Sequence, residues 1–203
     1  MDLLVLVADY QTITDRDSRR HFARTVEELV ADYLAVEIDP ARATIFAHSL
    51  VPELNQLVLP FLSLVTLPEL LRNPIVKEEA SISGMTALNG LMLTYPVHQA
   101  ADILFCKATI VPVGADQLRH VEQIRVIARR FNRRYAPEHP VFPEPMALLS
   151  DAPIVLGTDG RKMSKSRNNA IAIAASADET ARLLRHAKTD SDPHITDDPE
   201  NAS

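Results

Sequence analysis

The chain has 203 residues, of which 46% are hydrophobic and 24% charged, and its formal net charge is −6. This composition is ordinary for a globular protein, and the acidic balance argues against nucleic acid covering its whole surface. The single cysteine, Cys106, excludes an internal disulfide and fits a reducing compartment. The scattered histidines form no cluster of zinc ligands, so we expect no metal site. None of the five glycines is spaced for a G-x-G-x-x-G or Walker A loop, which leaves cations or a helix N-terminus for any phosphate binding.

Strands and helices are expected to alternate over the first part of the chain. The unbroken apolar run at 3–8 predicts a strand buried on both faces, and 43–47 predicts a second strand. Apolar residues at helical spacing predict helices over about 17–36 and over 51–72, with an interruption at Pro60. This order is typical of a parallel α/β sheet. The run at 3–8 lacks the features of a signal peptide, and no apolar run reaches the length of a membrane span, so we expect a cytoplasmic location.

The middle of the chain continues this alternation. A helix that restarts near Pro96 and ends near Lys107 precedes a strand at 109–113. A helix over about 116–134 follows, and Asp116 is the candidate N-cap of this helix.

Two loops and a short helix complete the expected order. Prolines predict a loop over 136–144, and the polar, glycine-flanked segment 157–169 predicts a mobile loop. Ser176 and Glu179 form a capping box that opens a helix to about Lys188.

Lys162 and Lys165 stand three residues apart in the loop at 157–169. Two lysines on a flexible loop can close on a polyphosphate, and their charge matters most when a pyrophosphate leaves and negative charge builds on its oxygens. The hydroxyls of Ser164 and Ser166 can add hydrogen bonds. For two lysines alone, a solvated charged loop is the competing interpretation.

Asp102 lies within an apolar helix, beside Ala101 and Ile103. A partly buried carboxylate needs a hydrogen-bond donor, and an indole N–H or a phenol can supply one. A surface carboxylate or a contact at a helix end is the alternative for this residue type.

Gly114 and Asp116 stand where the strand at 109–113 passes into a helix. In open α/β sheets, ligands bind beyond the carboxyl ends of the strands and next to helix N-termini. Gly114 permits a nucleotide close to the backbone, and Asp116 can accept hydrogen bonds from ribose hydroxyls. Capping of the helix is an equal alternative for Asp116.

Several segments together carry a resemblance to a known family. KMSKS at 162–166 matches, letter for letter, the signature of class I aminoacyl-tRNA synthetases. YPVHQAADILF at 95–105 and VPVGADQLRHVEQIRVIARRFN at 111–132 resemble the tryptophanyl members more than the tyrosyl members. LVADYQTIT at 6–14 and DPARATIFAHS at 39–49 extend the likeness over nearly the whole chain. The resemblance implies a class I synthetase catalytic core, which is an α/β fold with a Rossmann-like parallel sheet and flanking helices.

The resemblance also implies a tryptophan pocket and an ATP site. Asp102 would bind the indole nitrogen, and the other residues that line the pocket would be Gln99, Val111, Val113, Gln117, Ala8 and Gln11. ATP would contact the strand-helix turn and the signature loop, through Gly114, Ala115, Asp116, Ile154, Lys162, Met163, Ser164, Lys165 and Ser166. Lys162, Lys165 and Ser166 would hold the phosphates and form the catalytic set.

The reaction implied by the resemblance is that of a tryptophan–tRNA ligase, in two steps. The carboxylate of L-tryptophan attacks the α-phosphate of ATP, which gives tryptophanyl-adenylate and pyrophosphate, and the acyl group then passes to the terminal adenosine of tRNA-Trp. Positioning and charge stabilisation supply the rate without a protein nucleophile. Mg²⁺ accompanies ATP, and a homodimer built through 91–105 is expected.

Two parts of the family pattern are absent from the chain. A signature of the His-Ile-Gly-His type should precede LLVLVADYQT, where only Met1 and Asp2 stand, and the helical domain that reads the anticodon does not fit in the C-terminal remainder. We therefore expect a partial catalytic core at 1–175, without its first strand-loop-helix unit, and the truncated start of a C-terminal helical region with an acidic tail at 176–203. Such a chain is expected to have little or no aminoacylation activity alone.

Other functions stay open at this point. The chain could be a non-catalytic module that binds tryptophan or a nucleotide, or a partner of a full-length synthetase. A relative of the tyrosyl enzymes is less favoured. The arginine-rich face of the helix at 116–134 could contact tRNA phosphates, although a solvated amphipathic face is the favoured interpretation.

Overall fold

The computed structural model describes residues 2–13, 22–73, 76, 89–150, 154–164 and 167–189. The chain divides into two compact units, Met1–Ser150 and Asp151–Ser203. The first unit holds the paired strands and a helical core. Within the described ranges, no helix is both long enough and apolar enough to cross a membrane.

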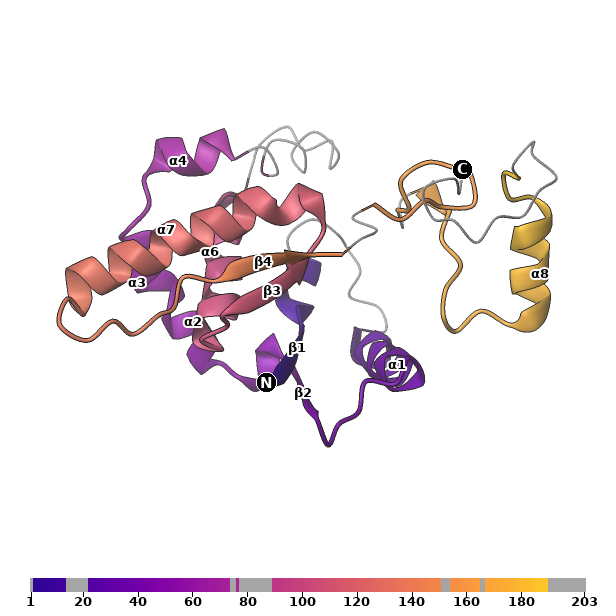
Figure 1. Cartoon of the computed structure of the whole chain (residues 1–203), viewed down its shortest axis with the longest axis horizontal. Helices are drawn as coiled ribbons and strands as arrows, with labels where there is room; N and C mark the ends of the chain where they lie inside the picture. The colour runs from indigo at the N-terminus through magenta and orange to yellow at the C-terminus, as the bar shows by residue number, and fades with distance from the viewer. Residues whose placement is uncertain are drawn as a thin grey trace. The chain divides into compact units, whose positions relative to one another are not determined.

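Among the described residues of the first unit, four short strands form two parallel pairs (Figure 1). β1 (Leu3–Val7) pairs residue for residue with β2 (Ala43–Ala47). β3 (Ile110–Val113) pairs in the same way with β4 (Met146–Leu149). Over the described part of the chain, the two pairs are separate two-stranded sheets. The three predicted strands are confirmed, and their parallel pairing agrees with the predicted α/β class.

The predicted helix between the first two strands is α1 (Phe22–Ala35). Its expected first turn, from residue 17, lies outside the described residues. A helical turn follows each strand of this pair: η1 (Asp9–Ile13) follows β1, and η2 (His48–Leu50) follows β2. Both turns therefore stand at the carboxyl ends of parallel strands.

The segment 51–72 forms three short helices, and the predicted interruption at Pro60 is wrong. The helices are α2 (Glu53–Gln56), α3 (Val58–Leu62) and α4 (Leu67–Arg72). Pro60 lies in the first turn of α3, where the missing N–H of a proline has no helical partner to lose.

α6 (Gly90–Phe105) is the central helix of the first unit. The side chain of Asn89 caps it by accepting the N–H of Met92 at 2.8 Å. The helix continues through Pro96, so the predicted restart near Pro96 is wrong. A single proline removes one backbone hydrogen bond and need not end a helix that is held by packing on several sides.

The core lies where α6 packs against α2, α3, α4 and α7 (Leu118–Tyr135). It is formed by apolar side chains that are at most 8% exposed: Leu54, Phe61, Leu64, Leu70, Val97, Ala100, Ala101, Leu104, Ile124, Ile127, Ala128 and Phe142. Its rings Phe61 and Phe142 and the partly buried Phe131, which packs against the core, meet edge to face with centroids 4.8 to 5.7 Å apart. Burial of these side chains is the main force that holds the helices together.

Asp116 is not the N-cap of α7, contrary to the prediction. A helical turn, η3 (Ala115–Gln117), separates β3 from α7, and Gln117 occupies the N-cap position without a side-chain capping hydrogen bond. Asp116 instead accepts a 3.4 Å hydrogen bond from Nε2 of Gln117.

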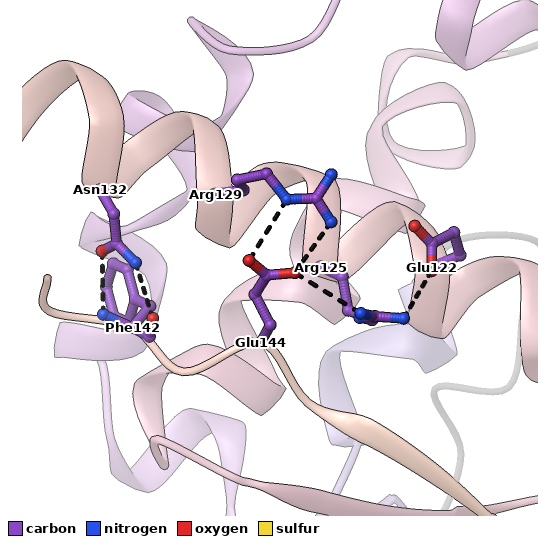
Figure 2. A network of polar contacts seen from close by, with 6 residues as sticks. All are labelled: Glu122, Arg125, Arg129, Asn132, Phe142 and Glu144. Atoms are coloured by element: carbon purple, nitrogen blue, oxygen red, sulfur yellow. Dashed lines mark hydrogen bonds and ion pairs between the residues drawn. The ribbon is translucent and has the colours of Figure 1, made fainter.

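Polar contacts fasten α7 to the segment that leads into β4, as Figure 2 shows. Nδ2 of Asn132 donates to the carbonyl of Phe142 at 2.7 Å, and its Oδ1 accepts the N–H groups of Val141 and Phe142 at 2.9 and 3.1 Å. Arg129 forms a bidentate pair with Glu144 at 3.2 and 2.8 Å, and this pair lowers the pKa of Glu144. The C-terminal part of the loop predicted at 136–144 is therefore held against α7.

Further arginines of α7 have carboxylate partners within the first unit. Arg125 lies 3.0 Å from Glu122 on the same helix. Arg130 reaches across to Glu69 on α4, with Nη2 2.6 Å from Oε1. Part of the positive charge on this helix is therefore already matched by acidic groups of the chain.

The second unit contains α8 (Ala177–Arg185). The side chain of Ser176 accepts the N–H of Glu179 at 3.2 Å, so the predicted N-cap is confirmed. The helix ends at Arg185, a little before the predicted end near Lys188.

Candidate functional site

Asp102 lies on the buried face of α6 and is 8% exposed. Its Oδ1 lies 2.9 Å from Nε2 of His48 and 3.7 Å from Nδ1 of His98. His48 is fully buried and begins η2, at the carboxyl end of β2. Asp102 is therefore a buried carboxylate rather than a surface one.

Residues of η1 complete the polar cluster around His48. Oδ1 of Asp9 lies 3.7 Å from Nδ1 of His48 and accepts the backbone N–H of Ser49 at 3.2 Å. The ring of Tyr10 stacks on His48 with centroids 5.7 Å apart and meets His98 edge-on at 6.4 Å. The cluster thus joins α6 to the turns that follow β1 and β2, the usual place for a ligand in an α/β fold.

His98 is the second imidazole of this cluster. Burial lowers its pKa, the Asp102 carboxylate opposes that effect, and proximity to His48 adds to the lowering. His98 is therefore neutral at neutral pH, and its Nε2 lies 3.0 Å from Oδ1 of Asn55.

Two buried oxygens on α6 have no partner in hydrogen-bond geometry among the described residues. They are Oδ1 of Asp102, whose 2.9 Å contact with His48 is not aligned as a hydrogen bond, and Oε1 of Gln99. The two residues are three positions apart and share one face of the helix. Because buried acceptors normally find donors, this face suits a ligand that brings N–H groups.

The other residues predicted to line the tryptophan pocket also lie in the first unit. Val111 and Val113 are half-buried on β3, and Gln117 is half-buried in η3. Ala8 is half-buried directly after β1, and Gln11 lies in η1. These residues occupy the carboxyl ends of β1 and β3.

The predicted ribose-binding residues form the turn between β3 and α7. Gly114 is half-buried, whereas Ala115 and Asp116 are exposed in η3. Their backbone and the Asp116 carboxylate face solvent at the end of a parallel strand, where a nucleotide can approach.

The signature loop begins as a tight hairpin in the second unit. Leu156 and Lys162 form an antiparallel bridge, and the N–H of Gly157 donates to the carbonyl of Arg161 at 2.7 Å. Gly160 has φ = 72°, a left-handed conformation that favours glycine. Lys162 is exposed at the end of this hairpin.

Of the other loop residues predicted to contact ATP, Ile154 and Met163 are exposed and Ser164 is half-buried. Lys165 and Ser166 lie outside the described residues.

Asn169 holds the base of the signature loop and is 3% exposed. Its Oδ1 accepts the N–H of Ser164 at 2.8 Å, and its Nδ2 donates to Asp159 at 2.7 Å and to the carbonyl of Lys162 at 3.3 Å. The hydrogen bond from Asn169 lowers the pKa of Asp159. The carbonyl of Thr158 accepts the N–H of Lys188, 2.7 Å away, which ties the loop to the segment after α8.

The tryptophan-lining set and the signature loop belong to different units of the chain. That Asp102 and Lys162 serve one ligand site stays a prediction.

The sequence analysis missed His48, His98 and Asp9, although the sequence contains a signal for each. His48 directly follows the strand at 43–47, just as Gly114 follows the strand at 109–113. His98 stands four residues before Asp102 on one helix, and Asp9 follows β1. The rule that selected Gly114, applied to every strand, finds two of the three.

Comparisons with known proteins agree with this architecture. The family model for tRNA synthetases class I (W and Y) matches residues 1–203. The tryptophan–tRNA ligase of Treponema pallidum is 47% identical over 189 residues, which cover 91% of this chain and 55% of that protein. The ligase of Thermotoga maritima is 43% identical over 197 residues, which cover 96% of this chain and 59% of that protein. The chain thus spans between half and two thirds of the length of these relatives.

Solved structures give the same result. The tryptophanyl-tRNA synthetase of Campylobacter jejuni, in complex with ADP and tryptophan, superposes with a TM-score of 0.80 at 30% identity over 92% of this chain and 57% of that one. A tyrosyl-tRNA synthetase from Archaeoglobus fulgidus shares the fold, with a TM-score of 0.68 at 24% identity. The match over the whole chain, together with the parallel strand pairs, shows that this chain belongs to the class I tRNA synthetases of the tryptophan and tyrosine family.

Proposed function

We propose that the chain forms the tryptophan- and ATP-binding part of a tryptophan–tRNA ligase. The observation that carries the proposal is the buried pair of acceptors on α6, Asp102 and Gln99, neither of which has a hydrogen-bonded donor among the described residues. An indole N–H is a donor without an acceptor, so it suits a buried carboxylate. The 47% identical relative is a tryptophan–tRNA ligase, which supports the choice of tryptophan over tyrosine.

The proposed pocket uses the carboxyl ends of the strands. Asp102 accepts the indole N–H, and Gln99 lies on the same helical face to accept a second donor of the ligand. The side chains of Val111 and Val113 on β3 contact the apolar part of the indole, together with Ala8, Gln11 and Gln117. A carboxylate that pairs with one N–H discriminates strongly against rings without that donor, because binding such a ring would leave a buried charge unpaired.

The proposed ATP site uses the turn after β3 and the signature loop. Gly114, Ala115 and Asp116 meet the ribose, and Ile154 lies near adenine. Lys162 and Lys165, with the hydroxyls of Ser164 and Ser166 and the backbone of Met163, hold the phosphates. As the tryptophan carboxylate attacks the α-phosphate, charge accumulates on the departing pyrophosphate, and Lys162, Lys165 and Ser166 stabilise it there. Mg²⁺ enters with ATP, bound to the phosphates.

We assign residues 1–175 to the catalytic core and 176–203 to the start of a C-terminal helical region. The acyl acceptor in this proposal is tRNA-Trp, and the assembled protein is a homodimer. Sedimentation of the purified chain tests the assembly.

Ligand binding tests the pocket directly. The chain contains no tryptophan, so the fluorescence of the ligand reports binding when it is excited at a wavelength that the four tyrosines of the chain do not absorb. Asp102→Ala is expected to abolish the affinity for L-tryptophan while the affinity for ATP remains. Asp116→Ala is the matched control, because it should weaken ATP binding and leave tryptophan binding intact. If tryptophan still binds to Asp102→Ala, the assignment of the indole is wrong.

ATP–pyrophosphate exchange in the presence of tryptophan then tests the chemical step. If the wild-type chain shows exchange and Lys162→Ala does not, the chain catalyses the activation step and Lys162 takes part in it. Tryptophan binding without exchange favours the alternative of a non-catalytic tryptophan-binding module.

A further inference from the structure

His48 lies between two carboxylates that come from different parts of the fold. Its Nε2 is 2.9 Å from Oδ1 of Asp102 on α6, and its Nδ1 is 3.7 Å from Oδ1 of Asp9 in η1. The side chains of His48 and Asp9 are 0% and 1% exposed, and that of Asp102 is 9% exposed. Charges and dipoles interact strongly in such a buried cluster, so the placement of the protons affects its stability.

The 2.9 Å contact requires a proton on Nε2 of His48. An imidazole lone pair at that distance from a carboxylate oxygen repels it, whereas an N–H attracts it. Neither ring nitrogen of His48 has a partner in hydrogen-bond geometry within the described ranges, so the Nε2–H and Oδ1 are close but not aligned. Such contacts in a ligand-free site commonly align only when the ligand binds.

Of the two imidazoles near Oδ1 of Asp102, His48 is the one that can donate a hydrogen bond to it. His98 is neutral, and its Nε2 is placed to donate to Oδ1 of Asn55 at 3.0 Å. The remaining nitrogen, Nδ1, then presents a lone pair toward Oδ1 of Asp102 from 3.7 Å. His48 is therefore the imidazole that can orient the Asp102 carboxylate within this cluster.

The orientation of the His48 ring is fixed by its neighbours. Tyr10 stacks on one face, at 18° between the ring planes, and His98 packs edge-on with centroids 4.9 Å apart. A ring held in this way cannot turn its Nε2 away from Asp102 without displacing Tyr10 or His98.

We propose that His48, oriented by Asp9 and Tyr10, is a positioning residue whose Nε2–H orients the Asp102 carboxylate, so that this carboxylate selects the indole N–H of tryptophan. This inference rests on the proposed function, because it assigns tryptophan to Asp102. A divalent transition ion is the rival explanation of the same geometry, since ligand atoms of His48, His98 and Asp102 lie within 4.8 Å of one another.

The test compares two substitutions of His48 in the full chain. His48→Gln keeps a side-chain N–H that can donate to Asp102, whereas His48→Leu removes the donor at similar volume. Calorimetry measures the dissociation constants of L-tryptophan and of β-(benzothiophen-3-yl)-alanine, in which sulfur replaces the indole N–H. Their ratio reports the hydrogen bond to the indole alone.

His48→Leu is expected to weaken tryptophan binding by about tenfold or more and to leave the sulfur analogue nearly unchanged, so the ratio falls by about tenfold. His48→Gln should keep the ratio within about threefold of the wild-type value. His120→Leu is the matched control. It replaces another buried histidine of the first unit, which lies on α7 and is 3% exposed, and it should leave the ratio unchanged.

The outcomes separate this inference from the proposed function. A ratio that His48→Leu does not change, with tryptophan still bound, overturns the inference alone. Loss of tryptophan binding in EDTA and its return with Zn²⁺ overturns the inference in favour of the ion. A wild-type chain that binds tryptophan no better than the sulfur analogue overturns both proposals.

If His48→Leu does not fold, the variant Asp9→Asn still tests the inference. Asp9→Asn keeps the acceptor for the N–H of Ser49 and removes the charge beside Nδ1 of His48. It should reduce the ratio by about threefold, and an unchanged ratio contradicts the role of Asp9.

Discussion

The side-chain oxygen of Asn169 accepts the backbone N–H of Ser164 at 2.8 Å, across the base of the loop that carries the KMSKS sequence. The same side chain donates to Asp159. Because Asn169 is 3% exposed, its loss removes hydrogen bonds that lie largely shielded from water at the base of the loop.

Asn169→Ala is therefore expected to increase amide hydrogen exchange at Ser164 by about tenfold or more, since about 1–3 kcal/mol of local stability is lost. Mass spectrometry or NMR of the exchanging chain measures it. Arg167→Ala, a neighbouring exposed position, should leave this rate unchanged. Equal protection of Ser164 in Asn169→Ala and wild type would falsify the role of this contact.

Substitution by alanine should change the free energy of unfolding in opposite directions at Gly157 and at Gly90. A Cβ at Gly157 meets the Asn169 side chain at 2.4 Å, whereas a Cβ at Gly90 has nothing within 4 Å. Gly157→Ala should destabilise the second unit by about 1–3 kcal/mol through overpacking. Gly90→Ala, in the first turn of α6, should be neutral or stabilising by up to about 1 kcal/mol. Urea unfolding compares them, and equal effects of the two changes would contradict this account.

Glu69 predicts how the stability of the first unit depends on pH. Hydrogen bonds from Arg130, followed by those from Thr66, lower the pKa of Glu69 from 4.5 to about 2. Because the folded-state pKa is depressed, the stabilisation is fully present above about pH 4.5 and is lost as the pH falls toward 2. Both side chains are about a third exposed, so the effect is about 1 kcal/mol after solvent screening.

The measurement is the free energy of unfolding in urea at several pH values. Glu69→Gln should be less stable than wild type at pH 7, and the difference should shrink below pH 4.5. Glu28→Gln is the control, because the exposed pair of Arg24 and Glu28 contributes at most about 0.5 kcal/mol. A difference for Glu69→Gln that is the same at pH 3 and pH 7 would rule out this linkage.

The side chain of Asn132 is expected to stabilise the loop before β4. Its three hydrogen bonds to the backbone of Val141 and Phe142 place the ring of Phe142 in the core, where it is 7% exposed (Figure 2). Asn132→Ala should cost about 2–3 kcal/mol of unfolding free energy. Asn132→Asp keeps the acceptor but places a carboxylate oxygen against the Phe142 carbonyl, to which Nδ2 donates at 2.7 Å, so it should cost at least as much.

Thermal and urea unfolding, followed by circular dichroism, check the order of these two variants. Arg133→Ala, an exposed position on the same helix, should stay within about 0.5 kcal/mol of wild type. The account fails if Asn132→Ala is as stable as the Arg133 variant.

The order of strands and helices could be predicted from periodicity, but local breaks could not. Pro60 and Pro96 each suggested an interruption, yet both lie inside helices. The cost of a proline depends on its position in the helix and on the packing around it, and neither is visible in a single sequence. β4 was missed because Met-Ala-Leu-Leu consists of residues that favour helices, and only pairing with β3 makes it a strand.

The candidate site could be predicted where a residue type and its chemistry stood in one short segment. Asp102 was selected because a carboxylate in an apolar helix needs a partner. The partner that the structure supplies, His48, is 54 positions away in the chain (102 − 48) and reaches Asp102 only through the fold. Long-range contacts of this kind are fixed by tertiary packing rather than by local spacing.

The hydrogen bond between Thr158 and Lys188 has a mechanical consequence. It connects the hairpin at the start of the signature loop to the segment that follows α8, so movements of the hairpin and of α8 are coupled. When the hairpin moves toward a ligand, either α8 moves with it or the hydrogen bond between Thr158 and Lys188 breaks. A spectroscopic label on α8 would therefore report movement of the hairpin without being attached to the hairpin itself.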